Sequence, residues 1–81
     1  MKRVVFSKRA EKSLARMQPK RRAAAVAKVK AFARGEKVDI RKLTGFDLYR
    51  IRVGNDRVII DDQGVVVLVI DAGPRGGIYK E

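Results

Sequence analysis

Residues 48–60 of the chain read LYRIRVGNDRVII. In this stretch, two segments with alternating apolar side chains flank the dipeptide Gly54-Asn55, and a two-residue connection of this composition is typical of a β-hairpin. A loop of two residues sets the register of the strands and places Arg52 opposite Arg57. The stretch therefore predicts a pair of antiparallel strands.

Alternation along the two strands divides the hairpin into two faces. The apolar face comprises Tyr49, Ile51, Val53, Val58 and Ile60. This face must cover the core, so Arg50, Arg52 and Arg57 are expected to share the face that is open to solvent. We call the face that carries these three arginines the arginine face.

Three guanidinium groups on one face repel each other, and arginine keeps its charge in proteins. The cluster makes sense if an anion binds between the side chains, because planar guanidinium groups match phosphate oxygens. A sheet face of this kind suits an RNA backbone. A simpler interpretation is also open: the arginines only hydrate an exposed face or pair with Asp47, Asp56 and Asp61.

The chain before the hairpin predicts a strand and two helices. Residues 2–6 form a β-branched run and precede Ser7, a good helix N-cap. After Ser7, the apolar residues Ala10, Leu14 and Met17 recur at helical spacing. They predict a first helix that begins at residue 8.

Pro19 interrupts this helix and starts a second one, because proline fits the first turn of a helix but not its interior. The second helix is expected to end near Arg34, with Gly35 as its cap. Its apolar face comprises Ala25, Val29 and Phe32.

The remaining segments complete a sheet. Residues 36–45 lack a clear period and are interpreted as a connection, while residues 46–53, 57–61 and 65–71 are strands. The run VVVLVI within the last strand is apolar at every position, which indicates an inner strand covered on both faces, with the VVF run of residues 4–6 as a neighbour. The order β-α-α-β-β-β predicts an α+β fold, a two-helix hairpin packed on a four-stranded, mostly antiparallel sheet. The length suits one domain spanning residues 1–81.

Composition excludes several kinds of site. The chain has no cysteine and no histidine, so it offers neither a disulfide nor the usual ligands of transition metals. A metal would have to bind carboxylates, and Asp61, Asp62 and Asp71 are better explained as turn and strand-end residues. No cofactor is therefore expected. No apolar run approaches the length of a signal peptide or a membrane span, so we expect a cytoplasmic protein.

The net charge of +11 is concentrated in the first half of the chain. Residues 1–42 contain 15 Lys and Arg and 3 Asp and Glu, a net charge of +12, whereas residues 43–81 contain 5 and 6, a net charge of −1. A surface this basic attracts polyanions, of which nucleic acid is the most common. An acidic protein segment or a membrane surface is the alternative.

The end of the chain, residues 71–81, reads DAGPRGGIYKE. The Gly73-Pro74 pair should turn the chain and place Arg75 near a strand end, and the glycines that follow could bend the chain so that Tyr79 returns to the arginine face. Alternatively, Arg75 is a surface charge and the ring of Tyr79 packs on the core.

In the order and spacing of these features, nearly the whole chain resembles the RelE/ParE superfamily of bacterial and archaeal toxins. It is most similar to the RelE-like mRNA interferases of type II toxin-antitoxin systems. The resemblance is carried by the hairpin stretch, the VVVLVI strand after it and the R-x-x-x-Y tail, all within a basic chain. It implies a RelE-like fold and a metal-independent endoribonuclease that cleaves mRNA on the ribosome and so inhibits translation.

The resemblance also implies roles for individual residues. Arg50 and Arg52 would bind the RNA, while Arg57 and Arg75 would stabilise the charge that develops on the scissile phosphate. Because arginine does not deprotonate, Tyr79 would accept the proton of the attacking ribose 2′-hydroxyl. The product would carry a 2′,3′-cyclic phosphate.

Two other functions remain open at this point. A ParE-like inhibitor of DNA gyrase would use the same fold without a catalytic cluster, and a catalytically degenerate homologue would only bind RNA or the ribosome. The resemblance further implies two partners: a cognate antitoxin protein, for which an acidic segment would complement the basic half of the chain, and mRNA in the ribosomal decoding site.

Overall fold

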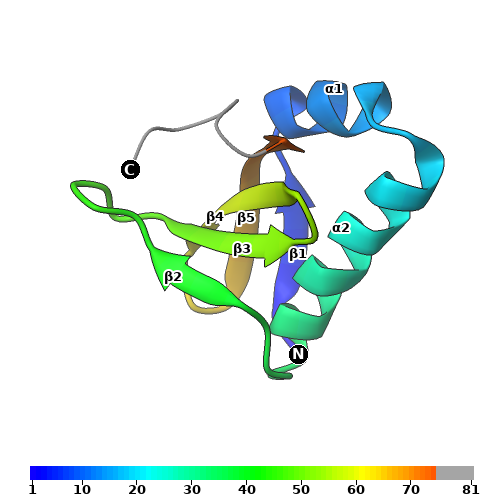
Figure 1. The fold of residues 1–81 in the computed structure, drawn as a ribbon. Coiled ribbons are helices and arrows are strands. Elements are labelled where there is room, and N and C mark those ends of the chain that lie inside the picture. Colours follow the sequence, from blue (N-terminus) through cyan, green and yellow to red (C-terminus); the bar gives the residue numbers. More distant parts are fainter. Residues whose placement is uncertain (75–81) are drawn as a thin grey trace.

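The computed structural model describes residues 1–74 (Figure 1). Its elements are β1 (Arg3–Phe6), α1 (Lys8–Arg16), α2 (Pro19–Ala33), β2 (Ile40–Lys42), β3 (Tyr49–Val53), β4 (Asp56–Asp62) and β5 (Val66–Pro74). The predicted α+β class is confirmed, with two helices that follow the first strand. No helix within residues 1–74 is both long enough and apolar enough to cross a membrane.

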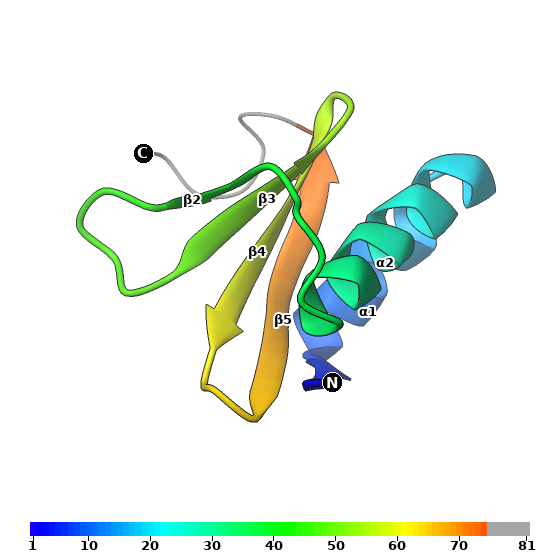
Figure 2. The same cartoon turned by 90° about the horizontal axis from the view of Figure 1, so that it is seen from below.

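The strands form one sheet in the order β1-β5-β4-β3-β2. β1 pairs with β5 in parallel, and every other neighbouring pair in this sheet is antiparallel. The predicted placement of the VVF run beside the VVVLVI run is therefore confirmed. Both helices lie on the same side of the sheet, as the view from below shows (Figure 2).

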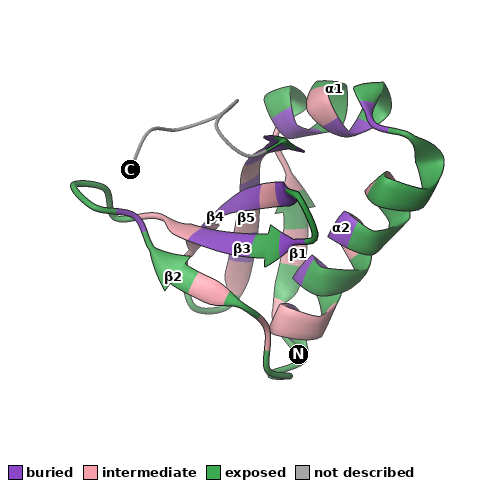
Figure 3. Cartoon of the chain, in the orientation of Figure 1, coloured by how far each residue is buried: buried purple, intermediate pink, exposed green. Residues whose placement is uncertain are grey.

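The helices pack on the sheet through the predicted apolar stripes. α1 begins after Ser7, whose hydroxyl accepts a hydrogen bond of 3.0 Å from the Ala10 N–H. α2 ends at Ala33 with Arg34 as its C-cap, and Gly35 follows with φ +85°, the left-handed conformation that commonly terminates a helix. The core comprises Ala10, Leu14, Met17, Ala25, Val29, Ile51, Val53, Val58, Ile60, Val67, Val69 and Ala72 (Figure 3).

The sheet has five strands, so the predicted number of four is wrong. The additional strand, β2, lies inside the segment that the sequence indicated to be a connection. Val38 and Ile40 pack against the core, whereas Asp39 and Arg41 are exposed, which is the alternation of a strand. The pattern is only a few residues long, and the strand forms because β3 supplies its partner.

β5 is an inner strand, as predicted, but it is not covered equally on both faces. Val67 and Val69 are fully buried beneath the helices, whereas Val66, Leu68 and Ile70 are only half-buried. The difference arises because both helices cover the same face of the sheet (Figure 2).

Candidate functional site

β3 and β4 form the predicted hairpin. The register pairs Val53 with Asp56 and Arg52 with Arg57, so the loop between the strands has two residues, as the sequence predicted. Gly54 at the start of this loop has φ +60°, a conformation that glycine adopts without steric cost. The loop therefore fixes which side chains face the helices and which face away.

The register confirms that Arg50, Arg52 and Arg57 share one face of the sheet. Their exposure differs, however. Arg52 is exposed and Arg57 is half-buried, whereas Arg50 is only 2% exposed. The prediction that all three guanidinium groups lie open to solvent is therefore wrong for Arg50.

The neighbouring strands explain the burial of Arg50. It has a facing residue on each side, Arg41 on β2 and Ile59 on β4. Arg52 faces Arg57 on β4, but on its other side β2 begins only at Ile40, which faces Ile51. An arginine stem packs readily along apolar surface, so the inner position of Arg50 contributes to the burial of its stem.

Burial changes what the arginine face can do with an anion. The Nε and Nη1 atoms of Arg50 and the Nε atom of Arg57 are buried. Electrostatic interactions are stronger in such a low-dielectric environment than in water. The inner part of the arginine face is thus better suited to stabilising charge, and exposed Arg52 to binding a flexible, hydrated ligand.

The carboxylates near the hairpin have other partners. Asp56, which is 4% exposed, accepts two hydrogen bonds from Arg21 of α2: Nε donates to Oδ2 at 2.9 Å, and Nη2 donates to Oδ1. Asp47 Oδ1 lies 3.9 Å from Nζ of Lys42 on β2. Asp61 Oδ2 accepts a hydrogen bond of 2.9 Å from Gln63. Each of the three carboxylates thus has a partner other than the three arginines.

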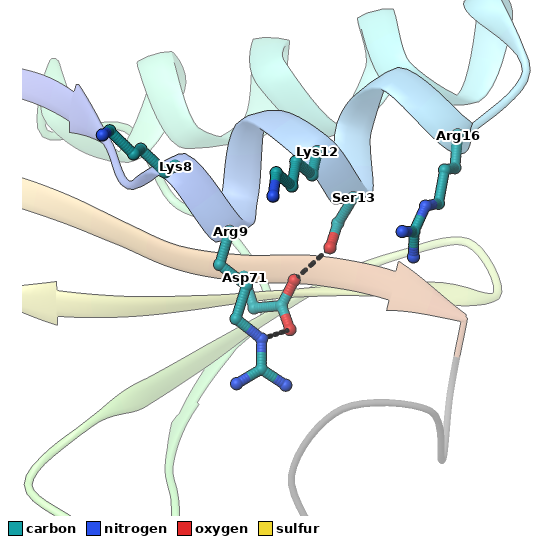
Figure 4. Close-up of a pocket in the computed structure, with 6 residues that line it drawn as sticks. All are labelled: Lys8, Arg9, Lys12, Ser13, Arg16 and Asp71. Carbon is teal, nitrogen blue, oxygen red and sulfur yellow. Dashed lines mark hydrogen bonds and ion pairs between the residues drawn. The ribbon is translucent and has the colours of Figure 1, made fainter.

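Asp71 connects β5 to α1 (Figure 4). Its carboxylate is 4% exposed, accepts a hydrogen bond of 2.5 Å from Ser13 Oγ and lies 2.9 Å from Arg9 Nε. The register between β4 and β5 shifts by one residue at Ile70, and such a bulge commonly redirects a side chain. The bulge thus lets a carboxylate of the sheet reach the helix.

The C-terminal end of β5, which Asp71 connects to α1, lies beside the arginine face. Gly73 faces Arg57 and adds no side chain next to its guanidinium group. Pro74 is the last residue of the strand. Arg75 and Tyr79, which the sequence assigned to the site, lie outside the described residues, so their roles remain predictions.

A pocket of about 380 Å³ lies beside α1 (Figure 4). It is lined by Lys8, Arg9, Lys12, Ser13, Arg16 and Asp71. Four of these side chains are basic and come from one short helix, so the pocket attracts anions. Part of the excess positive charge of residues 1–42 therefore lies around this pocket.

The other acidic side chains do not converge on one point. The ammonium group of Lys2 donates to Asp62 Oδ1 at 2.7 Å, and this bond, with a further one from the Gly64 N–H, lowers the pKa of the Asp62 carboxyl. Asp71 is held by α1 instead. Within residues 1–74, no group of three or more acidic side chains gathers that could hold a metal ion.

Sequence reasoning missed two contributors to this region. Arg41 lies opposite Arg50, and the alternation of residues 38–41 was the signal that could have revealed it. Arg21 binds Asp56 although 35 positions separate them in the sequence, and no local pattern links the two residues.

Comparison with known proteins gives the same picture of the fold. No family model and no curated protein matches the chain. Among solved structures, the RelB-RelE antitoxin-toxin complex from Methanococcus jannaschii contains a chain that is 28% identical, with a TM-score of 0.77 over 93% of this chain and 94% of that chain. The archaeal RelE-RelB complex from Pyrococcus horikoshii OT3 gives 28% identity and a TM-score of 0.72 over 95% and 98%.

A third structure shares the fold at lower identity. The toxin-antitoxin complex RelBE2 from Mycobacterium tuberculosis gives a TM-score of 0.78 at 22% identity, over 91% of this chain and 98% of that chain. The similarity spans nearly the full length in all three comparisons. Together with the predicted hairpin register, these similarities support a RelE-like toxin.

Proposed function

We propose that this RelE-like toxin is an endoribonuclease that cleaves mRNA on the ribosome and thereby stops translation in the cytoplasm. One observation carries the proposal. Arg50, Arg52 and Arg57 share a face of the sheet, while the buried carboxylates Asp56 and Asp71 are bound by the helices. Such a face favours a phosphate as its ligand.

The chemistry would be an internal displacement at phosphorus. The ribose 2′-oxygen forms a bond to the adjacent phosphorus, the bond from phosphorus to the 5′-oxygen of the next nucleotide breaks, and the 2′-hydroxyl proton passes to a base. Arg57, with Arg50 on the same face of the sheet, stabilises the negative charge that grows on the phosphate oxygens. In this proposal Arg75 adds to that stabilisation, and Tyr79 is the base.

Exposed Arg52 has a different role in the proposal. Its side chain binds the RNA strand next to the reacting phosphate, as an exposed guanidinium can without a large desolvation cost. The two roles follow the difference in burial. The more buried Arg50 and Arg57 stabilise the charge on the reacting phosphate, and exposed Arg52 binds the RNA strand.

The test is primer extension on a defined mRNA in a reconstituted translation reaction, with and without ribosomes. Wild-type protein should produce cuts only when ribosomes are present. Arg57→Ala should reduce the cleavage rate by at least about 100-fold, the usual effect of removing a group that stabilises a developing oxyanion. Arg3→Ala, which removes an equal charge from exposed β1, is the matched control and should cleave at the wild-type rate.

Two results would reject the proposal. Arg57→Ala cleaving as fast as the wild type would remove the arginine face from the reaction. A folded wild-type protein that makes no cuts would instead favour gyrase inhibition or RNA binding without catalysis, and a DNA supercoiling assay would separate these two functions.

We also propose that a small antitoxin protein binds and inhibits this chain. The two archaeal relatives at 28% identity were solved as complexes with RelB. An acidic segment would complement the +12 charge of residues 1–42. Binding to the folded state alone would raise the melting temperature by mass action, and thermal unfolding with a co-expressed antitoxin would detect this increase.

A further inference from the structure

The edge strand β2 adds a fourth guanidinium group to the arginine face. The register pairs Arg41 of β2 with Arg50 of β3, and residues that face each other in an antiparallel pair project to the same side. Arg41 therefore lies on the same side of the sheet as Arg52 and Arg57. Two pairs of facing arginines, 41 with 50 and 52 with 57, follow one another along β3.

In the part of the chain that the structure describes, the exposed arginine of each facing pair has no carboxylate partner that would reduce the repulsion between the two guanidinium groups. Within residues 1–74, neither Arg41 nor Arg52 forms an ion pair. Asp39, which is two positions before Arg41 and thus on the same face, forms none either. The exposed guanidinium groups of Arg41 and Arg52 can therefore bind an anionic ligand without first breaking an ion pair.

We propose that Arg41 is a substrate-binding residue that contacts an RNA phosphate next to the one that reacts. This proposal deepens the function given above and rests on its RNA-binding part. Neighbouring strands lie about 4.8 Å apart, and Arg57 is two residues along β4 from Ile59, the residue that faces Arg50. About 12 Å therefore separates the backbone of β2 at Arg41 from that of β4 at Arg57. That separation suits contact with different phosphates of one strand.

The position of Arg41 sets the direction of the RNA across the sheet. The line from Arg41 through Arg50 to Arg57 crosses β2, β3 and β4. Exposure decreases from the edge of the sheet, where Arg41 is exposed, to the buried side chain of Arg50. The RNA strand would enter over β2 and bring its reacting phosphate to the inner arginines.

A charged residue on an edge strand also has a simpler use, because it prevents unwanted pairing with another sheet. Lys42 would serve that use equally well. It is adjacent in the chain, exposed and basic, but it faces Tyr49, so it projects to the opposite side of the sheet. Arg41 and Lys42 therefore form a matched pair. Comparing them distinguishes an effect of position on the arginine face from an effect of positive charge on β2.

The experiment measures binding of the full-length protein to a fluorescent single-stranded RNA with 2′-O-methyl riboses, which cannot undergo 2′-hydroxyl attack. Fluorescence anisotropy at several salt concentrations gives the dissociation constant and its salt dependence. Arg41→Ala should weaken binding about tenfold, the loss of one charge-assisted contact. It should also reduce the slope of log affinity against log salt by about 0.7, the value for one phosphate contact on a single strand.

The control and the outcomes are defined by the matched pair. Lys42→Ala should bind as the wild type does. Equal weakening in both variants would show an effect of net charge and would overturn the proposal, as would unchanged binding by Arg41→Ala or no binding by the wild type. Because this RNA cannot be cleaved, the binding assay and the translation assay can fail separately. If Arg41→Ala weakens RNA binding but the wild type makes no cuts in the translation assay, only the proposed catalysis is rejected. If the wild type makes cuts but Arg41→Ala binds RNA normally, only the role of Arg41 is rejected.

Discussion

The two faces of the sheet handle charge in opposite ways. On the side of the helices, the buried carboxylate of Asp56 is bound by Arg21, and at the end of β5 the carboxylate of Asp71 is bound by Arg9 and Ser13. On the arginine face, Arg52 faces Arg57 and Arg41 faces Arg50. Opposite charges meet where the helices contact the sheet, and like charges face each other on the arginine face.

This difference separates folding from function in a small protein. Ion pairs between helix and sheet stabilise the folded chain, because the removal of one partner would leave a buried charge without compensation. Like charges that face each other cost stability, and the exposed members of the facing pairs, Arg41 and Arg52, can bind an anionic ligand instead. Substitutions on the two faces should therefore have opposite effects on stability.

The largest effect on stability is expected at the contact between α2 and the hairpin. Arg21→Ala would leave the carboxylate of Asp56 buried without its bidentate partner. We expect the midpoint of urea denaturation to fall clearly below that of the wild type, because a buried carboxylate would lose both hydrogen bonds.

Lys20 provides the control for this change. It is exposed, precedes Arg21 on α2 and lines the same pocket at the tip of the hairpin. Lys20→Ala removes an equal charge and should change stability by less than about 0.5 kcal/mol. Equal losses in the two variants would show that net charge, rather than the bond to Asp56, is what matters here.

A smaller effect is expected where Lys2 binds Asp62. The hydrogen bond from Lys2, with that from the Gly64 N–H, lowers the pKa of Asp62 below its ordinary value of 3.8. The unfolded state then binds more protons than the folded state between the two pKa values, so this contribution is present above the unfolded pKa and is lost as the pH falls through the folded pKa. Asp62→Asn should cost about 1 kcal/mol or less at pH 7.

Denaturation at a series of pH values between 7 and the acid range would check the sign, because the Asp62→Asn variant should lose less stability than the wild type below about pH 4. Asp61→Asn serves as the comparison, since Asp61 accepts only a neutral hydrogen bond from Gln63. A wild type and an Asp62→Asn variant with the same pH dependence would contradict this assignment.

Much of the fold was predictable because its signals are local. The loop at Gly54-Asn55 determined the register that places Arg52 opposite Arg57, and Ser7 determined the start of α1. The strand β2 was missed because three residues carry little pattern, and β3 determines their conformation. Local sequence predicts turns and caps better than it predicts short edge strands.

The sequence predicted that the arginines of the site share one face of the sheet. It did not predict how deeply each one is buried or which residues of other strands surround it. Alternation along β3 assigned Arg50 and Arg52 to the same side. The burial of Arg50 depends on Arg41 and Ile59, which come from two other strands. The bond from Arg21 to Asp56 likewise joins distant parts of the chain, and only the folded structure brings such residues together.

Arg52→Gln shows whether the arginine face serves the substrate or the fold, because it removes one charge from a facing pair while keeping a long, hydrophilic side chain. We expect urea denaturation to show stability unchanged or higher by about 0.5 kcal/mol, while cleavage of mRNA in the translation reaction falls about tenfold. A loss of stability above about 1 kcal/mol with cleavage unchanged would contradict this expectation, because Arg52 would then serve the fold rather than the substrate.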